Sequence, residues 1–224
     1  REGEALRDFR YPDRIVIGTN NPKKISPILK KLYDPIIKKG AKFIVVSRKA
    51  AELIKYAANA FLATKITFIN EIANLCEKTG INVDDIAEGI GTDQRIGSRF
   101  LRAGPAYGGS CFPKDTKALA KTSDDFKVNL SLVKNVIRSN GNRNNLIVQK
   151  ILKIAKQNNL KKIGFLGVTF KANTDDMRDS SSLFIIPKLL KNNLKISYYE
   201  PTGSKIILSK YKKIKYCINQ KELI

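Results

Sequence analysis

Residues from about Ala50 to Thr79 contain neither glycine nor proline, the two residues that most often interrupt a helix. Apolar side chains recur along this stretch at helical spacing and form two stripes. One stripe holds Leu53, Ala57, Ala60 and Phe61, and the other holds Leu62, Ile66, Ile69, Ala73 and Cys76. A helix that is apolar on more than one side must bury both sides. We therefore expect it to lie between domains or subunits and to form the spine of a homodimer.

Lys55 and Asn59 lie four residues apart in this stretch. Such a spacing places both side chains on one face of the expected helix. An ammonium group and an amide on that face could both address the negative charge that develops on a reacting oxygen. The alternative is that Lys55 is an ordinary solvated charge, which is the usual state of an exposed lysine.

A glycine-rich loop at residues 104–115 surrounds Cys111, in the order Gly108-Gly109-Ser110-Cys111-Phe112-Pro113-Lys114-Asp115. Glycines permit a tight backbone with exposed N–H groups, and Lys114 and Asp115 follow closely enough to share the site. Cations and backbone N–H dipoles favour the thiolate, which is the nucleophilic form of cysteine. These residues suit covalent catalysis by Cys111, whereas the alternative is a cysteine packed in a turn.

The composition argues against several classes of protein. A chain of 224 residues with 42% hydrophobic content can build one large or two modest domains. Three cysteines without any histidine argue against a disulfide framework and against a common zinc site. No apolar run approaches the roughly 18 residues that a membrane span needs, and residues 1–20 lack a signal-peptide pattern. We expect a soluble cytoplasmic protein that holds no metal.

The net charge of +22 raises nucleic-acid binding as an alternative. Clustered lysines would release counterions from a phosphate backbone, so such binding would depend steeply on salt. The lysines are scattered over most segments, however, and general basicity argues for solubility more than for a binding stripe. We therefore expect no nucleic-acid partner.

The hydrophobic pattern predicts an α/β fold. Strands are expected at residues 14–18, 42–46, 163–168, 195–199 and 214–218. The strands at 14–18 and 163–168 are expected to be buried. Helices are expected from Pro22 through Leu32, from Asn82, and over residues 116–123, 130–157 and 183–190. Pro187 falls inside the last of these, where it would cost about 3 kcal/mol unless the helix starts late or kinks.

Five motifs, in order along the chain, resemble the UDP-glucose/GDP-mannose dehydrogenase family. They are Lys55–Ala63, Phe68–Ala73, Asp93–Gly97, Gly108–Asp115 and Thr169–Arg178. The resemblance implies incomplete Rossmann-like pieces at both ends, joined by the long helix and a helical dimerisation domain. Residues 1–48 would end an NAD-binding domain, 49–145 would form the central domain, and 146–224 an incomplete UDP-binding domain. No Gly-x-Gly-x-x-Gly occurs, so the expected NAD-binding segment is missing from this sequence.

The resemblance also implies roles for individual residues. The catalytic residues would be Cys111, Lys55, Asn59 and Asp115; the substrate-binding residues Arg95, Phe100, Leu101, Arg102, Tyr107, Gly108, Lys114, Phe170 and Lys171; and the cofactor-binding residues Glu2 and Arg178. Arg95 would reach the substrate of the neighbouring subunit. For several of these a structural role remains open: an ion pair of Arg95 with Asp93, loop capping by Asp115, and salt bridges of Lys171 and Arg178 to Asp175, Asp176 or Asp179.

The reaction implied by the resemblance is the oxidation of UDP-glucose to UDP-glucuronate with two NAD. Cys111 would capture the aldehyde as a thiohemiacetal, and water held near Asp115 would later hydrolyse a thioester on the same sulfur. Because the cofactor segment is missing, we expect this chain alone not to reduce NAD. The alternatives are a non-catalytic remnant that only binds UDP-sugar or dimerises, and a GDP-mannose dehydrogenase, although Asp93-Gln94-Arg95-Ile96-Gly97 favours the glucose enzyme.

Overall fold

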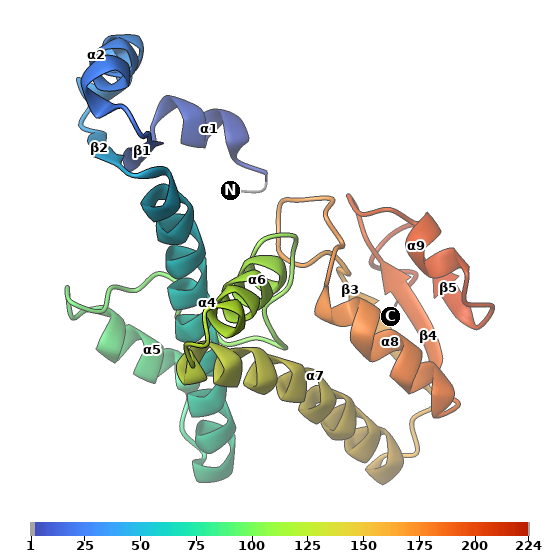
Figure 1. Ribbon diagram of the computed structural model, residues 1–224. Helices are drawn as coiled ribbons and strands as arrows, with labels where there is room; N and C mark the ends of the chain where they lie inside the picture. The colour runs from blue at the N-terminus through green and yellow to red at the C-terminus, as the bar shows by residue number, and fades with distance from the viewer. Residues whose placement is uncertain (1–2, 224) are drawn as a thin grey trace. The chain divides into compact units, whose positions relative to one another are not determined.

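The computed structural model describes residues 3–223, which divide into two compact units (Figure 1). The units are Arg1–Ala58 and Asn59–Ile224, and the boundary between them falls inside a long helix. Glu2 lies outside the described residues. Among the described residues, no helix combines the length and the apolar character that a membrane crossing requires.

The first unit holds a two-stranded parallel sheet. Its elements are α1 (Ala5–Arg10), β1 (Arg14–Gly18), α2 (Pro22–Leu32), α3 (Asp34–Ile37) and β2 (Lys42–Val46), and β1 pairs with β2 from Arg14↔Lys42 to Gly18↔Val46. Both strands match the predicted bounds. The expectation that β1 is buried is wrong, because its side chains are exposed or only half-buried. In a sheet of two strands each strand has a single neighbour, so less of its surface is covered.

The long helix is α4 (Arg48–Thr79), which begins two residues before the predicted stretch. Ile69, Ala73 and Cys76 of the second apolar stripe are buried. In the first stripe Ala60 is buried, but Leu53 and Phe61 are 53% and 67% exposed. In the single chain the second stripe packs on its own protomer and much of the first faces outward, so the expected burial of both stripes between domains or subunits stays a prediction.

Three further helices carry the central part of the second unit: α5 (Val83–Gly91), α6 (Phe112–Asp125) and α7 (Ser131–Gln157). Helix α6 begins four residues earlier than predicted, with Cys111 at its N-cap and a proline in its first turn. A proline is tolerated there because the first N–H groups of a helix have no intrahelical partner. Ala63 of α4, Tyr107 of the loop and Val136 of α7 form a small core that Ile66 and Phe112 complete.

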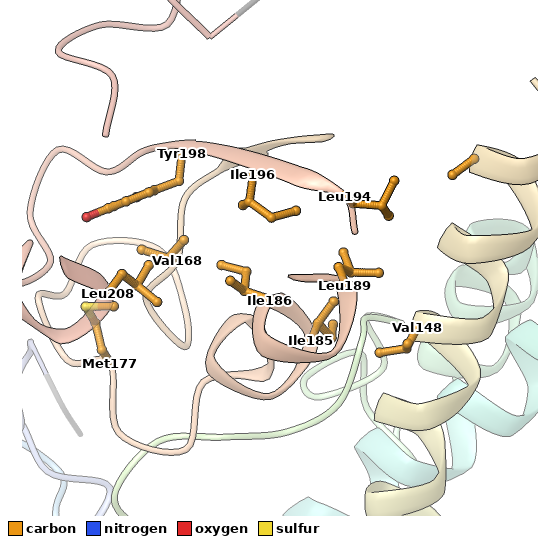
Figure 2. Close-up of a cluster of buried hydrophobic side chains, with 11 residues drawn as sticks. Val148, Val168, Met177, Ile185, Ile186, Leu189, Leu194, Ile196, Tyr198 and Leu208 are labelled. Carbon is orange, nitrogen blue, oxygen red and sulfur yellow. The ribbon is translucent and has the colours of Figure 1, made fainter. Parts of the chain in front are cut away.

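A three-stranded parallel sheet forms the rest of the second unit. Its elements are β3 (Lys162–Leu166), α8 (Ser181–Lys191), β4 (Lys195–Tyr199), α9 (Ile206–Ser209) and β5 (Ile214–Tyr216), with the strand order β3-β4-β5. Figure 2 shows the main core, in which Ile186 and Leu189 of α8 face Ile196 of β4. Val148 contributes to this core from α7, so the long helix α7 is anchored on the sheet.

The prediction of a buried strand at residues 163–168 is wrong in two respects. Strand β3 ends at Leu166, and its burial alternates between exposed and half-buried positions. Ile163 and Phe165 pack on the core, whereas Leu166 is 65% exposed. Successive side chains of a strand point to opposite faces, so only every second residue of β3 faces the core and the residues between them are exposed.

Pro187 lies inside α8 without delaying the start of the helix. The helix begins at Ser181, two residues before the predicted start, and the Ser180 hydroxyl accepts a hydrogen bond from the backbone N–H of Ser182. Pro187 has no N–H, which removes one backbone hydrogen bond. The neighbouring Ile186 and Leu189 are completely buried. Full burial of such a side chain contributes about 1.5–3 kcal/mol, so the two together offset the cost of the proline.

Candidate functional site

Cys111 lies at the N-cap of α6 with its side chain exposed. The other two cysteines, Cys76 and Cys217, are buried. The Ser110 hydroxyl lies 3.7 Å from the Cys111 sulfur. The alternative of a cysteine packed inside a turn is therefore wrong, and Cys111 is the cysteine that a substrate in solution can reach.

Gly108 and Gly109 allow the cysteine loop to pack closely against residues 170–180. A Cβ on Gly108 would lie 2.2 Å from the carbonyl oxygen of Asp179, and one on Gly109 would lie 2.7 Å from the Phe170 ring. Gly109 also has a φ of 83° and donates its N–H to the carbonyl of Arg178 at 2.9 Å. The two glycines thus serve a close approach between segments, and the N–H of Gly109 is not exposed for an anion as expected.

Asp115 is completely buried one helical turn after Cys111. The side-chain amide of Asn59 donates to Asp115 Oδ2 at 2.6 Å, and the Lys114 ammonium lies 3.4 Å from Oδ1, which has no hydrogen bond. The carboxylate is thus held by Asn59 and Lys114, which does not support the loop-capping alternative. Lys55 is exposed on α4, one turn before Asn59.

An aromatic cluster borders the loop on the α6 side. The Phe112 ring lies 6.0 Å from that of Phe100 and 6.1 Å from that of Tyr107, the latter edge-on. Leu101 is buried and Arg102 is exposed, while burial raises the pKa of Tyr107. Hence Phe100, Leu101 and Tyr107, three of the residues predicted to line a substrate pocket, help to pack the loop.

Behind this loop lies a cavity of about 370 Å³. It is lined by Tyr107, Asn140 and Asn144 together with Pro113 of α6 and the first turn of α8. Cys111 is not among the lining residues. The cavity therefore borders the back of the loop, and the exposed sulfur lies outside it.

The segment after β3 carries three more of the predicted residues. The Lys171 ammonium lies 5.7 Å from the centre of the Phe170 ring. The Arg178 backbone N–H and guanidinium Nε both donate to Asp176 Oδ1, at 2.8 and 3.0 Å, and Nη2 donates to Oδ2 at 2.9 Å. The side-chain hydrogen bond of Arg178 is the main cause that lowers the pKa of Asp176. The salt-bridge alternative is thus observed for Arg178, with Asp176 as the partner.

Arg95 lies on the turn after α5 and is paired with Asp93. Its Nη2 lies 2.6 Å from Asp93 Oδ2, and its side chain is 90% exposed. This is the surface ion pair that the sequence left open as the alternative. The ammonium of Lys65, which the sequence analysis did not single out, donates to the carbonyls of Ile96 and Gly97 at 2.9 Å each and ties this turn to α4.

Sequence reasoning missed the polar side chains that hold the loop from behind. Asn140 of α7 accepts from the Tyr107 N–H at 2.8 Å and donates to the Tyr107 carbonyl at 3.0 Å. Asn70 of α4 accepts from the Gly104 N–H at 2.8 Å, and Arg143 Nε donates to the Gly104 carbonyl at 3.0 Å. An asparagine inside a predicted helix is the only local signal, and it does not indicate which backbone group the side chain will meet.

Glu200, the acid that follows β4, could have indicated a nucleotide site. Its carboxylate is buried, however, and accepts from the backbone N–H groups of Val168, Thr169, Thr202 and Gly203. A carboxylate that is occupied in this way is not free to bind a ribose. Its role is to tie the segment after β3 to the turn after β4.

The turn after β1 does not suit the pyrophosphate of NAD. Such a site needs free N–H groups at the start of a helix. Here the Asn21 N–H donates to the Thr19 hydroxyl, the Lys24 N–H donates to the Asn21 side chain, and Pro22 has no N–H. The described residues of this turn therefore do not fit a dinucleotide.

The parallel α/β fold and the exposed cysteine at a helix start define an α/β protein with a candidate nucleophilic thiol. Two models of one family match the chain: the central domain of the UDP-glucose/GDP-mannose dehydrogenase family at residues 49–142 and its UDP binding domain at residues 164–224. Together they cover more than half of the sequence. The chain belongs to the UDP-glucose/GDP-mannose dehydrogenase family.

Individual relatives are similar over nearly the whole chain. The UDP-glucose 6-dehydrogenase of Rickettsia felis is 49% identical over 91% of this chain, and that of Bacillus subtilis is 45% identical over 90%. The structure of a UDP-glucose dehydrogenase from Pyrobaculum islandicum superposes on this chain with a TM-score of 0.91 at 33% identity. The match covers 100% of this chain and 51% of the Pyrobaculum chain. The chain spans 45% of each of the two curated relatives, which is about half their length.

Proposed function

We propose that this chain supplies the UDP-sugar site and the reactive thiol of a UDP-glucose 6-dehydrogenase. The observation that carries the proposal is the docking of the Cys111 loop, through Gly108 and Gly109, on the Phe170–Asp179 segment of the family's UDP binding domain. A sugar nucleotide that binds this segment would bring its sugar to the exposed sulfur. The names of the relatives support UDP-glucose as the substrate.

In the proposed chemistry, the Cys111 thiolate adds to the C6 aldehyde, which is the two-electron oxidation product of the C6 hydroxyl of the sugar, and forms the oxyanion of a thiohemiacetal. The carbonyl π bond breaks as the C–S bond forms, and the electron pair moves to the oxygen. Asn59 would offset that charge. The same role for Lys55 stays a prediction. Asp115 would orient the Asn59 amide by accepting its hydrogen bond.

Four further expectations stay predictions. They are the use of NAD as cofactor, the inactivity of this chain alone, the cytoplasmic location, and the domain boundaries at 48 and 145.

The experiment that tests this proposal is a calorimetric titration of the chain with UDP-glucose. We expect binding with a Kd on the order of 10–100 μM, which corresponds to about −5.5 to −7 kcal/mol. GDP-mannose should bind at least about tenfold weaker, a difference of about 1.4 kcal/mol. The Cys111→Ser variant should bind UDP-glucose as the wild type does, because the sulfur acts on the aldehyde and not on the nucleotide.

The other candidates predict different titrations. A folded chain, as judged by circular dichroism, that binds neither sugar nucleotide would contradict the proposal and favour the remnant. Preference for GDP-mannose would identify the other branch of the family. Tight binding of DNA with a steep salt dependence would instead support the nucleic-acid alternative.

We also propose that the chain forms a homodimer through α4. Phe61, Phe68 and Leu75 follow each other at seven-residue spacing and are 67%, 49% and 60% exposed. A contiguous apolar stripe of this kind is typical of a protein interface. Sedimentation equilibrium should give twice the chain mass of 25.1 kDa, and Phe68→Glu should give the single mass. Lys153→Glu, the introduction of the same charge at an exposed position of α7, should leave the dimer intact. A monomeric wild type would disprove the proposal.

A further inference from the structure

The loop that precedes Cys111 has no regular secondary structure between Leu101 and Gly108. A loop of this kind must find partners for its buried backbone groups outside itself. At two positions, Gly104 and Tyr107, both the N–H and the carbonyl are bonded by side chains from the helices behind the loop. The conformation of the loop therefore depends on a few polar side chains of α4 and α7.

Asn140 makes the more specific of the two connections. Its Oδ1 accepts from the N–H of Tyr107 at 2.8 Å, and its Nδ2 donates to the carbonyl of the same residue at 3.0 Å. A side-chain amide that meets both polar groups of one residue fixes the orientation of the two peptide planes that flank it. Tyr107 is itself only 7% exposed, so water cannot replace these bonds without cost.

Asn70 and Arg143 hold Gly104 in the same manner. Asn70 accepts from its N–H, and Arg143 donates to its carbonyl. Arg143 is buried and donates further to the carbonyl of Asn70 and to the side chain of Asn74, so the guanidinium links the loop to α4. Two backbone positions three residues apart are therefore held from the same side.

We propose that Asn140 is a positioning residue for the sugar-nucleotide site, with Asn70 and Arg143 in support; this inference rests on the proposed function. Tyr107 directly precedes Gly108, whose backbone meets the carbonyl of Asp179. The orientation of the Tyr107 peptide planes therefore also determines where Gly108, Gly109 and the start of α6 lie. Asn140 would act on substrate affinity through the loop, without touching the substrate.

The test is the Asn140→Asp variant, titrated with UDP-glucose at two values of pH. A carboxylate can still accept from the Tyr107 N–H, but it has no proton to donate and repels the Tyr107 carbonyl. At pH 8 we expect the Kd to rise by about 5- to 150-fold over the wild type, the effect of losing one buried hydrogen bond. Partial burial and repulsion by the Tyr107 carbonyl disfavour the ionised carboxyl and so raise its pKa above that of a free aspartate. A larger share of the carboxyl is therefore protonated at pH 5 and can donate again, so the Kd should lie closer to the wild-type value than at pH 8.

Two controls separate positioning from a general loss of stability. Asn142→Asp, the same change at an exposed position of α7, should leave the Kd unchanged at both pH values. In the Asn140→Ala variant, hydrogen exchange of the Tyr107 amide should accelerate at least about tenfold, while the amide of Ile196 in the core exchanges as before. Uniform acceleration of all amides would show a merely structural role and overturn the proposal.

The remaining outcomes are also decisive. A loss of affinity in Asn140→Asp that is the same at pH 5 and pH 8, or no loss in Asn140→Ala, would overturn the positioning role. If the wild type binds no UDP-glucose, the proposed function fails. The exchange of the Tyr107 amide then still decides whether Asn140 holds the loop, because that measurement needs no ligand.

Discussion

The Gly108→Ala variant is expected to lose about 3 kcal/mol of unfolding free energy and to bind UDP-glucose at least about 100-fold more weakly. The added Cβ would lie 2.2 Å from the carbonyl oxygen of Asp179 and 3.0 Å from its carbonyl carbon. A contact this short with backbone cannot be relieved by a rotamer change, so the two segments must move apart. Separation would carry the Cys111 loop away from the segment that holds Phe170 and Lys171.

Gly104→Ala is the matched control for this prediction. No atom lies within 4 Å of the position that its Cβ would take. We expect a change in stability within about 0.5 kcal/mol and an unchanged Kd. Urea denaturation followed by titration measures both quantities. Equal stability and equal affinity of the Gly108 and Gly104 variants would show that the loop does not dock on the Asp179 segment.

The Glu200→Gln variant is expected to lose about 2–4 kcal/mol of unfolding free energy at neutral pH. Oε2 accepts from the N–H groups of Val168 and Thr169, and Oε1 accepts from the N–H groups of Thr202 and Gly203. Either orientation of a glutamine amide directs its NH₂ group at two of these donors. Buried donors left without an acceptor cost about 1–3 kcal/mol each. Glu88→Gln, at an exposed position of α5, should change stability by less than about 0.5 kcal/mol.

The dependence of this effect on pH follows from the pKa of Glu200. Burial raises that pKa, but the hydrogen bonds from the four backbone N–H groups outweigh burial and hold the pKa below its ordinary value of 4.5. A folded-state pKa that is lowered contributes stability above the unfolded-state pKa, and this contribution is lost as the pH falls through the folded-state value. The difference between wild type and variant should therefore be constant near neutral pH and shrink below about pH 4.5. A constant difference down to acid unfolding would contradict this role of the carboxylate.

Glu200 also connects stability to the proposed site. Val168 and Thr169, which it holds, directly precede Phe170 and Lys171. Loss of the carboxylate should thus loosen the segment on which the Cys111 loop docks. In the structure Glu200 thus holds two backbone turns together.

The regular elements could be predicted where the signal is local. The bounds of β1, β2 and β4 match, because each is a short run of β-formers between turn residues. Helix α4 follows from a long stretch without glycine or proline. The short helices α1, α3 and α9, of six, four and four residues, were missed. Helices of this length are not stable on their own, so their sequences carry little signal.

The candidate site could be predicted as a set of residues but not as an arrangement. The motif around Cys111 singled out the one exposed cysteine of the described residues as the candidate nucleophile, and the spacing of Lys55 and Asn59 placed them on one helix face. The bond from Asn59 to Asp115 spans 56 positions, and no periodicity indicates such a partner. The observed pairs of Arg95 with Asp93 and of Arg178 with Asp176 had been left open as alternatives.

The sequence by itself determined the α/β class, the long helix, the family and the choice of Cys111 among the three cysteines as the candidate nucleophile. These depend on local periodicity and on contiguous motifs. The tertiary structure decided why Gly108 and Gly109 are glycines, which side chains hold the loop and what Glu200 does. Each of these depends on a contact between distant segments, such as the 33 positions from Tyr107 to Asn140 and the 32 from Val168 to Glu200. A hydrogen bond or a steric contact acts over a few ångströms in space, so the fold, and not the neighbours in sequence, selects its partners.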